Sequence, residues 1–317
     1  MSLHSRTAAL GWMGVRPRSV VFVAFILGIT LLAAGARAET RPGEEAKTAF
    51  TIGLIPERNV FKQMERYTPL AEYLSRKTGL DVKLKIFLRY EKIIDGFVSM
   101  RMDGVFFGSL TYVLAHEQIG VRVLVRPERL DGSSFYHGLV FVRKDSGIKH
   151  VAEMRGKRFA FVDPASAAGF LLPLVYLRSH GVKDYKSYLG ETYFTGTNED
   201  AVYDVLNGKA DIGAAKNSVF WEMAAADTRI REELKILTRS PDMPETALAV
   251  RKDLNPQVGL AIRDALLQMQ SDPLGRAVLE GLGMRRFVPT SDADYAPVIS
   301  YLHQIGYSPK NYHFPAE

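Results

Sequence analysis

The stretch FAFVDPASAAGF, residues 159–170, decides the fold and points to a function. Its apolar residues predict a strand, Asp163-Pro164 predicts a tight turn, and small residues then lead into an apolar-periodic helix through Leu177. The first amides of a helix lack internal partners and carry partial positive charge, so small side chains there let an oxyanion approach the backbone. The alternative is an ordinary strand–helix connection in which Ser166 is an N-cap.

Strand and helix patterns also alternate on both sides of this stretch. Upstream, we expect strands at 51–55, 82–86, 104–108 and 121–125 and helices at 61–77, 90–102 and 109–117. From residue 146 a second such unit predicts strands at 159–162, 192–194, 211–215 and 235–238 and helices at 168–180, 199–207 and 218–226. Helices follow in 254–317. Such alternation is typical of α/β folds with mostly parallel sheets.

Two similar junctions divide these units. Residues 139–145 and 247–253 are β-rich runs that both end in Val-Arg-Lys-Asp. We expect the chain to cross into a second lobe at the first run and to return at the second, which would place a hinge beside a ligand cleft. Chance is the alternative explanation for a four-residue match. The predicted lobes are 49–142 with 248–317, and 143–247.

The first 38 residues predict the compartment. A basic leader precedes an apolar run at 20–34, and Ala36-Arg37-Ala38 is a cleavage pattern. The apolar run is shorter than the ~20 residues of a membrane span, so the pattern predicts a secretory signal peptide. An uncleaved anchor is the alternative. We expect a periplasmic protein that begins at Glu39.

Composition excludes several classes of protein. The leader holds four Arg and no acidic residue, so the net charge falls from +6 to +2 (41 − 4 basic residues against 35 acidic ones) on its removal. No basic cluster indicates a nucleic-acid partner. The absence of Cys excludes disulfides and thiolate metal sites. The seven His form no metal-ligand pair and no catalytic motif is found, so we expect neither an enzyme nor a metal or cofactor.

Several motifs in order carry a resemblance to a known family. They are Gly53–Pro56, Pro69–Leu74, Asp145–Ile148, Phe161–Ser166 and Gly208–Ala214. Over residues 50–255 the chain resembles the periplasmic phosphate/phosphite/phosphonate-binding proteins of ABC importers. The resemblance implies a two-lobed type II periplasmic binding fold, with mostly parallel sheets flanked by helices and joined by two hinge strands.

The same resemblance implies a function and partners. We expect a monomer that captures a small anionic ligand between its lobes and delivers it to the membrane permease of an ABC importer. A periplasmic sensing subunit that docks on a receptor kinase is the alternative, because both roles use the same cleft.

The chain departs from the family pattern at the expected anion site. Where the family usually has hydroxyl residues after Ser166, this chain has Ala167 and Ala168, and Asn198 stands before Glu199 where the family often has His. Each absent donor would contribute roughly 1.5–3 kcal/mol to a charged ligand. Backbone donors from Ser166 to Gly169 remain.

Lys216 is the candidate for the missing charge. It follows the strand at 211–215, at the carboxyl end of a parallel sheet, where ligands usually bind. The alternative is a solvated lysine before a capped helix. A ligand-binding Lys216 predicts that Lys216→Met weakens binding and leaves the stability of the ligand-free protein nearly unchanged.

Further candidates lie near the cleft on both sides. Tyr90 matches a tyrosine that the family keeps near its ligand, although a core aromatic is the alternative. Ser109 and Tyr112 occupy the turn of the first lobe, and Tyr136 and His137 precede the hinge. The complete predicted ligand-binding set is Tyr90, Ser109, Tyr112, Tyr136, His137, Ser166, Ala167, Ala168, Gly169, Asn198, Glu199 and Lys216.

Overall fold

A computed structural model of the chain describes residues 47–315. The signal peptide predicted at 1–38 lies outside these residues. The strands are β1 Ala49–Leu54, β2 Asp81–Ile86, β3 Gly104–Phe107, β4 Arg122–Arg129, β5 Phe135–Tyr136, β6 Gly138–Arg143, β7 Arg158–Phe161, β8 Glu191–Phe194, β9 Ile212–Lys216, β10 Leu234–Arg239, β11 Met243–Pro244, β12 Ala247–Val250 and β13 Met284–Pro289. No helix within 47–315 is both long enough and apolar enough to span a membrane.

The α-helices are α1 Val60–Thr78, α2 Ile93–Ser99, α3 Ser109–Ile119, α4 Leu172–Ser179, α5 Tyr185–Tyr188, α6 Asn198–Leu206, α7 Asn217–Ala226, α8 Arg229–Glu233, α9 Pro256–Leu267, α10 Pro273–Gly281 and α11 Ala296–Gln304. Short 3₁₀ turns lie at η1 Tyr90–Lys92, η2 Lys144–Ser146, η3 Val151–Met154, η5 Met269–Ser271 and η6 Asp292–Tyr295. The predicted helix at 168–180 begins with a π-helical turn, η4 Ala167–Leu171, that continues into α4.

The first sheet has the strand order β13-β4-β12-β3-β1-β2. β1 pairs in parallel with β2 and β3, as the βαβ pattern predicts. β12 comes from much later in the chain and is inserted between β3 and β4, antiparallel to both. β3 and β4 therefore run in the same direction without being neighbours.

The second sheet repeats this plan with the order β10-β6-β9-β7-β8. β7 pairs in parallel with β8 and β9, and β6 lies antiparallel between β9 and β10. In each sheet most strands are co-directional and one antiparallel strand is inserted among them. The first sheet also has β13 at its edge, antiparallel to β4. The predicted alternation of strands and helices in the two units is confirmed, whereas β13 lies within 254–317, where only helices were expected.

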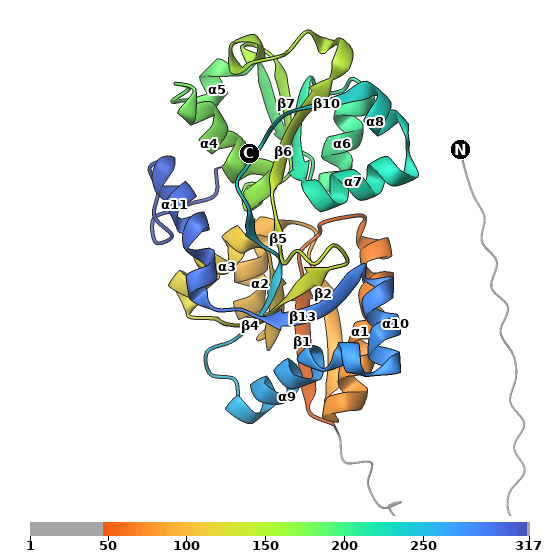
Figure 1. Cartoon of the computed structure of the whole chain (residues 1–317). Helices are drawn as coiled ribbons and strands as arrows, with labels where there is room; N and C mark the ends of the chain where they lie inside the picture. Colours follow the sequence, from red (N-terminus) through yellow and green to blue (C-terminus); the bar gives the residue numbers. More distant parts are fainter. Residues whose placement is uncertain (1–46, 316–317) are drawn as a thin grey trace, which may run out of the picture. The chain divides into compact units, whose positions relative to one another are not determined.

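The chain passes between the sheets through a short antiparallel ribbon, β5 paired with β11, and Figure 1 shows β5 between β4 and β6. The predicted location of the crossings is wrong in detail. The two Val-Arg-Lys-Asp runs lie at the ends of β6 and β12, one in each sheet, after the chain has already crossed. The apolar runs mark sheet strands, whereas a two-residue crossing strand leaves no periodic pattern.

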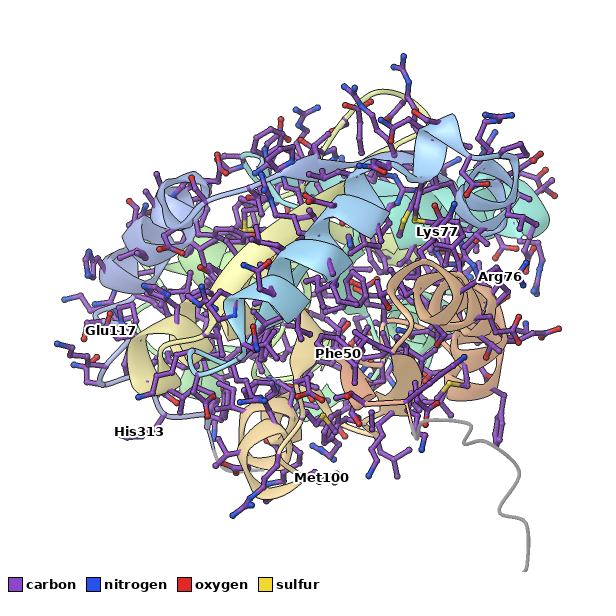
Figure 2. The ribbon with its side chains drawn as sticks, turned by 90° about the horizontal axis from the view of Figure 1, so that it is seen from below. Phe50, Arg76, Lys77, Met100, Glu117 and His313 are labelled. Carbon is purple, nitrogen blue, oxygen red and sulfur yellow. The ribbon has the colours of Figure 1, made fainter. Side chains whose placement is uncertain are left out.

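Helices cover both faces of each sheet. One face of the first sheet packs against α1, α9 and α10, and in Figure 2 α9 lies across the sheet with the end of α1, at Arg76 and Lys77, beside it. α2, α3 and α11 pack on the other face, and α11 also contacts α4. The second sheet lies between α6, α7 and α8 on one face and α4 and α5 on the other. All these helices bury apolar side chains against the strands.

The start of α1 has a local explanation. The Asn59 side chain accepts hydrogen bonds from the amides of Phe61 and Lys62, which caps the helix. The helix ends at Gly79, whose positive φ of 74° favours glycine. The loop Glu57–Asn59, which ends with this cap, is thereby fixed near the carboxyl end of β1.

We predict that Phe141→Ala lowers the free energy of unfolding by about 3–5 kcal/mol, because it leaves a cavity in the second sheet. Phe141 lies in β6, is fully buried and packs on Phe220 with ring centroids 5.1 Å apart. Phe61→Ala is the matched control, since Phe61 is 81% exposed, and should change stability by less than about 0.5 kcal/mol. Urea unfolding of both variants measures the difference, and equal losses would contradict the assignment of the core.

Candidate functional site

The turn after β7 forms a loop, Asp163–Gly169, that we call the anion loop. The Asp163 carboxylate accepts a hydrogen bond from the Ala165 amide at 2.8 Å, so this side chain orients its own turn. The Ser166 hydroxyl accepts from the Gly169 amide at 3.0 Å and caps the helix that follows. A β-carbon at Gly169 would lie 2.2 Å from Val162 Cγ2, so the loop requires glycine there.

The amides of Ala167 and Ala168 are the open donors of this loop. Both residues are buried, and no hydrogen-bond partner for either amide is found among residues 47–315. Buried backbone donors are nearly always paired, so two neighbouring unpaired amides at a helix start indicate a place for an external acceptor.

Tyr90, Asn198 and Lys216 are brought together beside the anion loop. The Tyr90 amide donates to Asp163 at 3.1 Å, and the Tyr90 hydroxyl lies 3.3 Å from Asn198 Nδ2. Asn198 Oδ1 accepts from the Lys216 amide at 2.8 Å. Three residues of the predicted set thus connect the start of η1 with the ends of β7 and β9.

The Lys216 ammonium lies between two carboxylates. Its Nζ is 2.6 Å from Glu245 Oε2 and 3.2 Å from Glu57 Oε1, and Thr246 lies 3.4 Å away. Burial opposes the charge of Lys216, but the two carboxylates outweigh it and raise the pKa of the ammonium. Burial likewise opposes ionisation of Glu57, yet Lys216 and the Thr246 hydroxyl lower its pKa overall.

Ser109 and Tyr136 form a second polar contact in this region. The Ser109 hydroxyl, on the first residue of α3, lies 2.6 Å from the Tyr136 hydroxyl. Lys216 Nζ lies 4.7 Å from the centroid of the Tyr136 ring, a cation–π contact. We call Lys216, Glu57 and Glu245 the ion cluster. The Tyr136 side chain therefore reaches from the ion cluster to the start of α3.

Glu199 joins the same region through the loop after β1. Its carboxylate accepts from the Asn59 amide at 3.1 Å and lies 3.9 Å from Arg58. Arg58 also makes a bidentate pair with Glu222 of α7, at 2.7 Å and 2.5 Å. The predicted Glu199 thus contacts the first-sheet loop.

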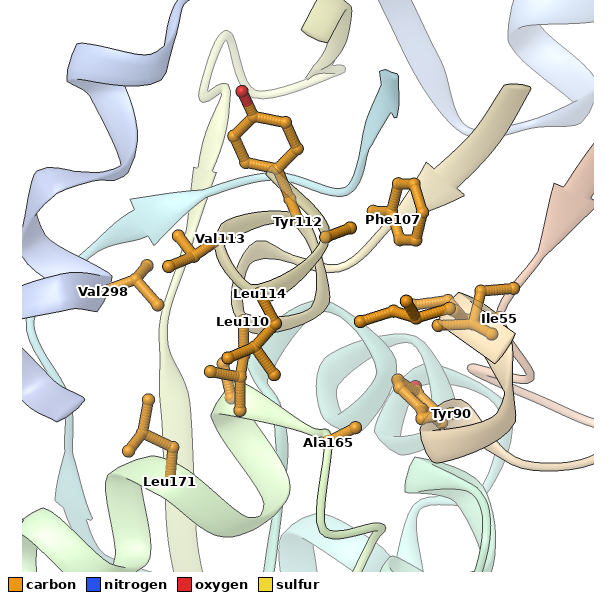
Figure 3. Packing of buried hydrophobic residues seen from close by; sticks show 14 of the residues in the cluster. Ile55, Tyr90, Phe107, Leu110, Tyr112, Val113, Leu114, Ala165, Leu171 and Val298 are labelled. Carbon is orange, nitrogen blue, oxygen red and sulfur yellow. The ribbon is translucent and has the colours of Figure 1, made fainter. Parts of the chain in front are cut away.

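The Tyr112 ring lies apart from the anion loop, and the His137 ring has a partner of its own. The Tyr112 hydroxyl donates to Asp292, and Figure 3 shows its ring pointing away from Ala165 and Tyr90. His137 Nδ1 lies 3.5 Å from Asp242, and burial lowers the pKa of the imidazole. Apolar side chains fill the space between Tyr112 and the anion loop, where Leu110, Ala165 and Leu171 belong to one buried cluster (Figure 3).

Sequence reasoning missed the partners of Lys216. Glu57 lies three residues after the end of β1, and Glu245-Thr246 directly precede β12. A polar residue at the carboxyl end of a parallel strand was the signal for Lys216, and the same signal at the end of β1 could have found Glu57. Glu245 lies in the crossing segment, whose position in space depends on the pairing of β5 with β11.

A cavity of about 50 Å³ adjoins the ion cluster. Glu57, Lys216, Glu245 and Thr246 line it, together with Arg129. Glu245 Oε1 is buried without a hydrogen bond within 47–315, and Arg129 Nη1 lies 3.8 Å away. The cavity can hold water, which would satisfy this oxygen. No group of three or more potential metal ligands is found in the described part of the chain.

The family model for the ABC transporter, phosphonate, periplasmic substrate-binding protein matches residues 52–295. The chain belongs to this family. It is a family of solute-binding proteins and not of enzymes, which confirms the predicted class of function.

Curated relatives cover most of the chain. The phosphonates-binding periplasmic protein of Escherichia coli (strain K12) is 26% identical over 262 residues, which span 80% of this chain and 76% of that protein. The phosphate-import protein PhnD of Mycolicibacterium smegmatis is 24% identical over 245 residues, 73% of this chain and 76% of that protein.

Solved structures share the fold. A binding protein component of an ABC phosphonate transporter from Pseudomonas aeruginosa gives a TM-score of 0.75 at 21% identity, covering 81% of this chain and 87% of that chain. PhnD1 of Prochlorococcus marinus (MIT 9301), in complex with methylphosphonate, gives 0.72 at 20% identity, covering 81% and 98%. The predicted type II periplasmic binding fold is confirmed.

The ion cluster of this phosphonate-family protein changes the expected stability of the ligand-free Lys216→Met variant. Because the variant leaves Glu57 and Glu245 buried beside each other without a cation, we predict a loss of about 3–5 kcal/mol in the free energy of unfolding. Lys209→Met is the matched control, since Lys209 pairs with Asp204 at 2.9 Å but is 65% exposed, and should lose less than about 1 kcal/mol. Chemical denaturation of the ligand-free proteins measures both losses in the free energy of unfolding. An unchanged stability of Lys216→Met would show that the cluster is not formed.

Asp163 predicts a pH dependence of stability. Burial raises the pKa of Asp163 from its ordinary 3.8 to about 6, although the Ala165 and Tyr90 amides partly oppose the shift. Between these values the unfolded chain has lost the proton and the folded chain keeps it, so this group makes stability fall as pH rises.

We therefore predict that the stability difference, wild type minus Asp163→Asn, falls by about 2–3 kcal/mol between pH 4 and pH 7. Groups common to both proteins cancel in this difference. Urea unfolding of the two proteins at matched pH values measures it. A difference that stays constant or rises with pH would rule out the raised pKa.

Proposed function

We propose that this protein is exported to the periplasm, binds a small phosphonate-type oxyanion at the anion loop between its two sheets, and delivers it to the permease of an ABC importer. The pair of buried, unpartnered amides at Ala167 and Ala168 is the observation that carries the proposal. The predicted signal peptide at 1–38 supports export.

Neutral donors dominate the proposed site. Ser166 Oγ accepts from Gly169, so its own hydrogen remains for the ligand. Ser109 and Tyr136 use one of their two hydroxyl hydrogens in their mutual contact, and the other is available for an oxyanion. Because these donors carry no net charge, they bind an anion without adding a buried cation.

Lys216 then has a different role from the one expected. Its ammonium already has two carboxylate partners. We therefore assign Lys216 to holding together the segments that carry Glu57 and Glu245, rather than to neutralising the charge of the ligand. Tyr90 and Asn198 hold the anion loop and the end of β9 in register. Glu199 holds the loop after β1 through the Asn59 amide, and the Tyr112 hydroxyl and the His137 ring have partners of their own in Asp292 and Asp242.

The choice of ligand class comes from the relatives. Their names specify phosphonates and phosphate, and one related structure holds methylphosphonate. We propose phosphonate, phosphite and phosphate as the ligands to be tried for this chain, each with oxygens that can accept from the two amides.

A proline substitution tests the amides directly. Ala167→Pro deletes one donor, and proline is favoured at the first position of a helix. Ser166, the residue before it, has φ −84° and ψ 121°, which a following proline accepts. We predict that Ala167→Pro weakens binding by roughly 1.5–3 kcal/mol, the contribution of a hydrogen bond to a charged group. Titration calorimetry with methylphosphonate, phosphite and phosphate measures it.

Ala167→Gly is the control at the same position, because it changes the side chain but keeps the amide. It should retain most of the wild-type affinity. If Ala167→Pro binds as tightly as the wild type, the Ala167 amide does not contact the ligand. If the wild type binds none of the three oxyanions, the proposed ligand class is wrong.

A further inference from the structure

We call the loop Glu57–Asn59 after β1 the cleft loop. Each of its residues contacts either the second sheet or a helix that packs on that sheet. Lys216, at the end of β9, pairs with the Glu57 carboxylate. Arg58 pairs with Glu222 of α7, and the Asn59 amide donates to Glu199 of α6. Asn198 Nδ2 also lies 3.4 Å from the Glu57 carbonyl oxygen. One short loop thus contacts the strand β9 and the helices α6 and α7.

The ion pair at Glu57 is the buried part of this contact. The side chains of Lys216 and Glu57 are 7% and 20% exposed, whereas Glu222 at the rim is 48% exposed. A rim pair contributes little in water, but the loss of one partner from a buried pair is strongly destabilising. Glu57 and Lys216 therefore contribute more than the Arg58 pair to keeping the two sheets in contact.

The charge of Lys216 is compensated without a ligand. In a cleft that closes around an anion, a buried cation would remain unpaired when the anion is absent, and the closed form would be disfavoured. Here Glu57 and Glu245 supply the negative charge from within the chain, and Thr246 bridges to Glu57 with a hydrogen bond of 2.7 Å. Lys216 therefore gives the empty cleft no electrostatic reason to open.

We propose that Glu57 is a built-in counter-ion that latches the two sheets together in the ligand-free protein, so that a ligand enters only when the Glu57–Lys216 pair opens. The latch itself is independent of the ligand's identity. Its consequence for binding rests on the proposed function: the apparent dissociation constant rises as the fraction of open, binding-competent molecules falls.

Distance measurements between the sheets test the latch. The chain has no native Cys, so spin labels can be attached at Thr68→Cys on α1 and Ala225→Cys on α7, two exposed positions. In the ligand-free protein we expect one population at the short distance of the latched form. Glu57→Gln keeps the size of the side chain and removes its charge, so a second population at longer distance should appear.

The expected change is large. Loss of a buried ion pair should lower the ratio of latched to open molecules by about tenfold or more. Glu233→Gln is the matched control, because it breaks the Arg143–Glu233 pair of 2.7 Å within the second-sheet region and should leave the distances unchanged. Glu222→Gln, at the exposed rim, should give a smaller shift and remains informative if Glu57→Gln folds poorly.

Kinetics provide a second readout. The Trp221 side chain lies on α7 next to Glu222 and can report the binding of methylphosphonate by fluorescence. With an opening step before binding, Glu57→Gln should bind methylphosphonate several-fold faster than the wild type. An equal association rate in both proteins would overturn the gating.

The outcomes separate the latch from the proposed function. A ligand-free wild type already at the long distance, or a Glu57→Gln distribution identical to those of the wild type and Glu233→Gln, would overturn the latch while oxyanion binding stands. If Glu57→Gln lengthens the distance but calorimetry detects no oxyanion binding by the wild type, the latch is supported and the proposed ligand class fails.

Discussion

The ammonium group of Lys216 is buried between the carboxylates of Glu57 and Glu245, and three separate segments of the chain meet at it. The segments are the end of β9, the loop after β1 and the crossing before β12. A buried charge is tolerated only with close partners, so each segment must arrive in register for the others to be stable. The relation between the two sheets follows from this requirement.

The anion loop has a different physical basis, because it depends on backbone groups. Asp163 and Ser166 satisfy the amides of Ala165, Ser166 and Gly169 from within the loop, which leaves the amides of Ala167 and Ala168 open. A site made from amides needs no specific side chain at those positions. In the proposed site, alanine at 167 and 168 is therefore compatible with holding an anion.

This difference explains how much could be predicted from the sequence. The strand, turn and capped helix at 159–170 depend on neighbours in the chain, so they were predicted correctly. The family motifs gave the two-lobed fold. The partners of Lys216 could not be found in this way, because Glu57 and Glu245 reach it only through the β5–β11 pairing. The crossings were misplaced for the same reason, since two-residue strands are held by partners distant in sequence.

The inserted strand β12 also sets the order in which the sheets can form. Every strand of the second sheet lies within 138–239, so that sheet can be completed by one continuous segment. The first sheet must wait for β12, and until then β3, with the sequence GVFF, has one unpaired edge. An apolar edge is a hazard for aggregation, and non-local pairing is slow. The sheet whose first strands are synthesised first is therefore the sheet that is completed last.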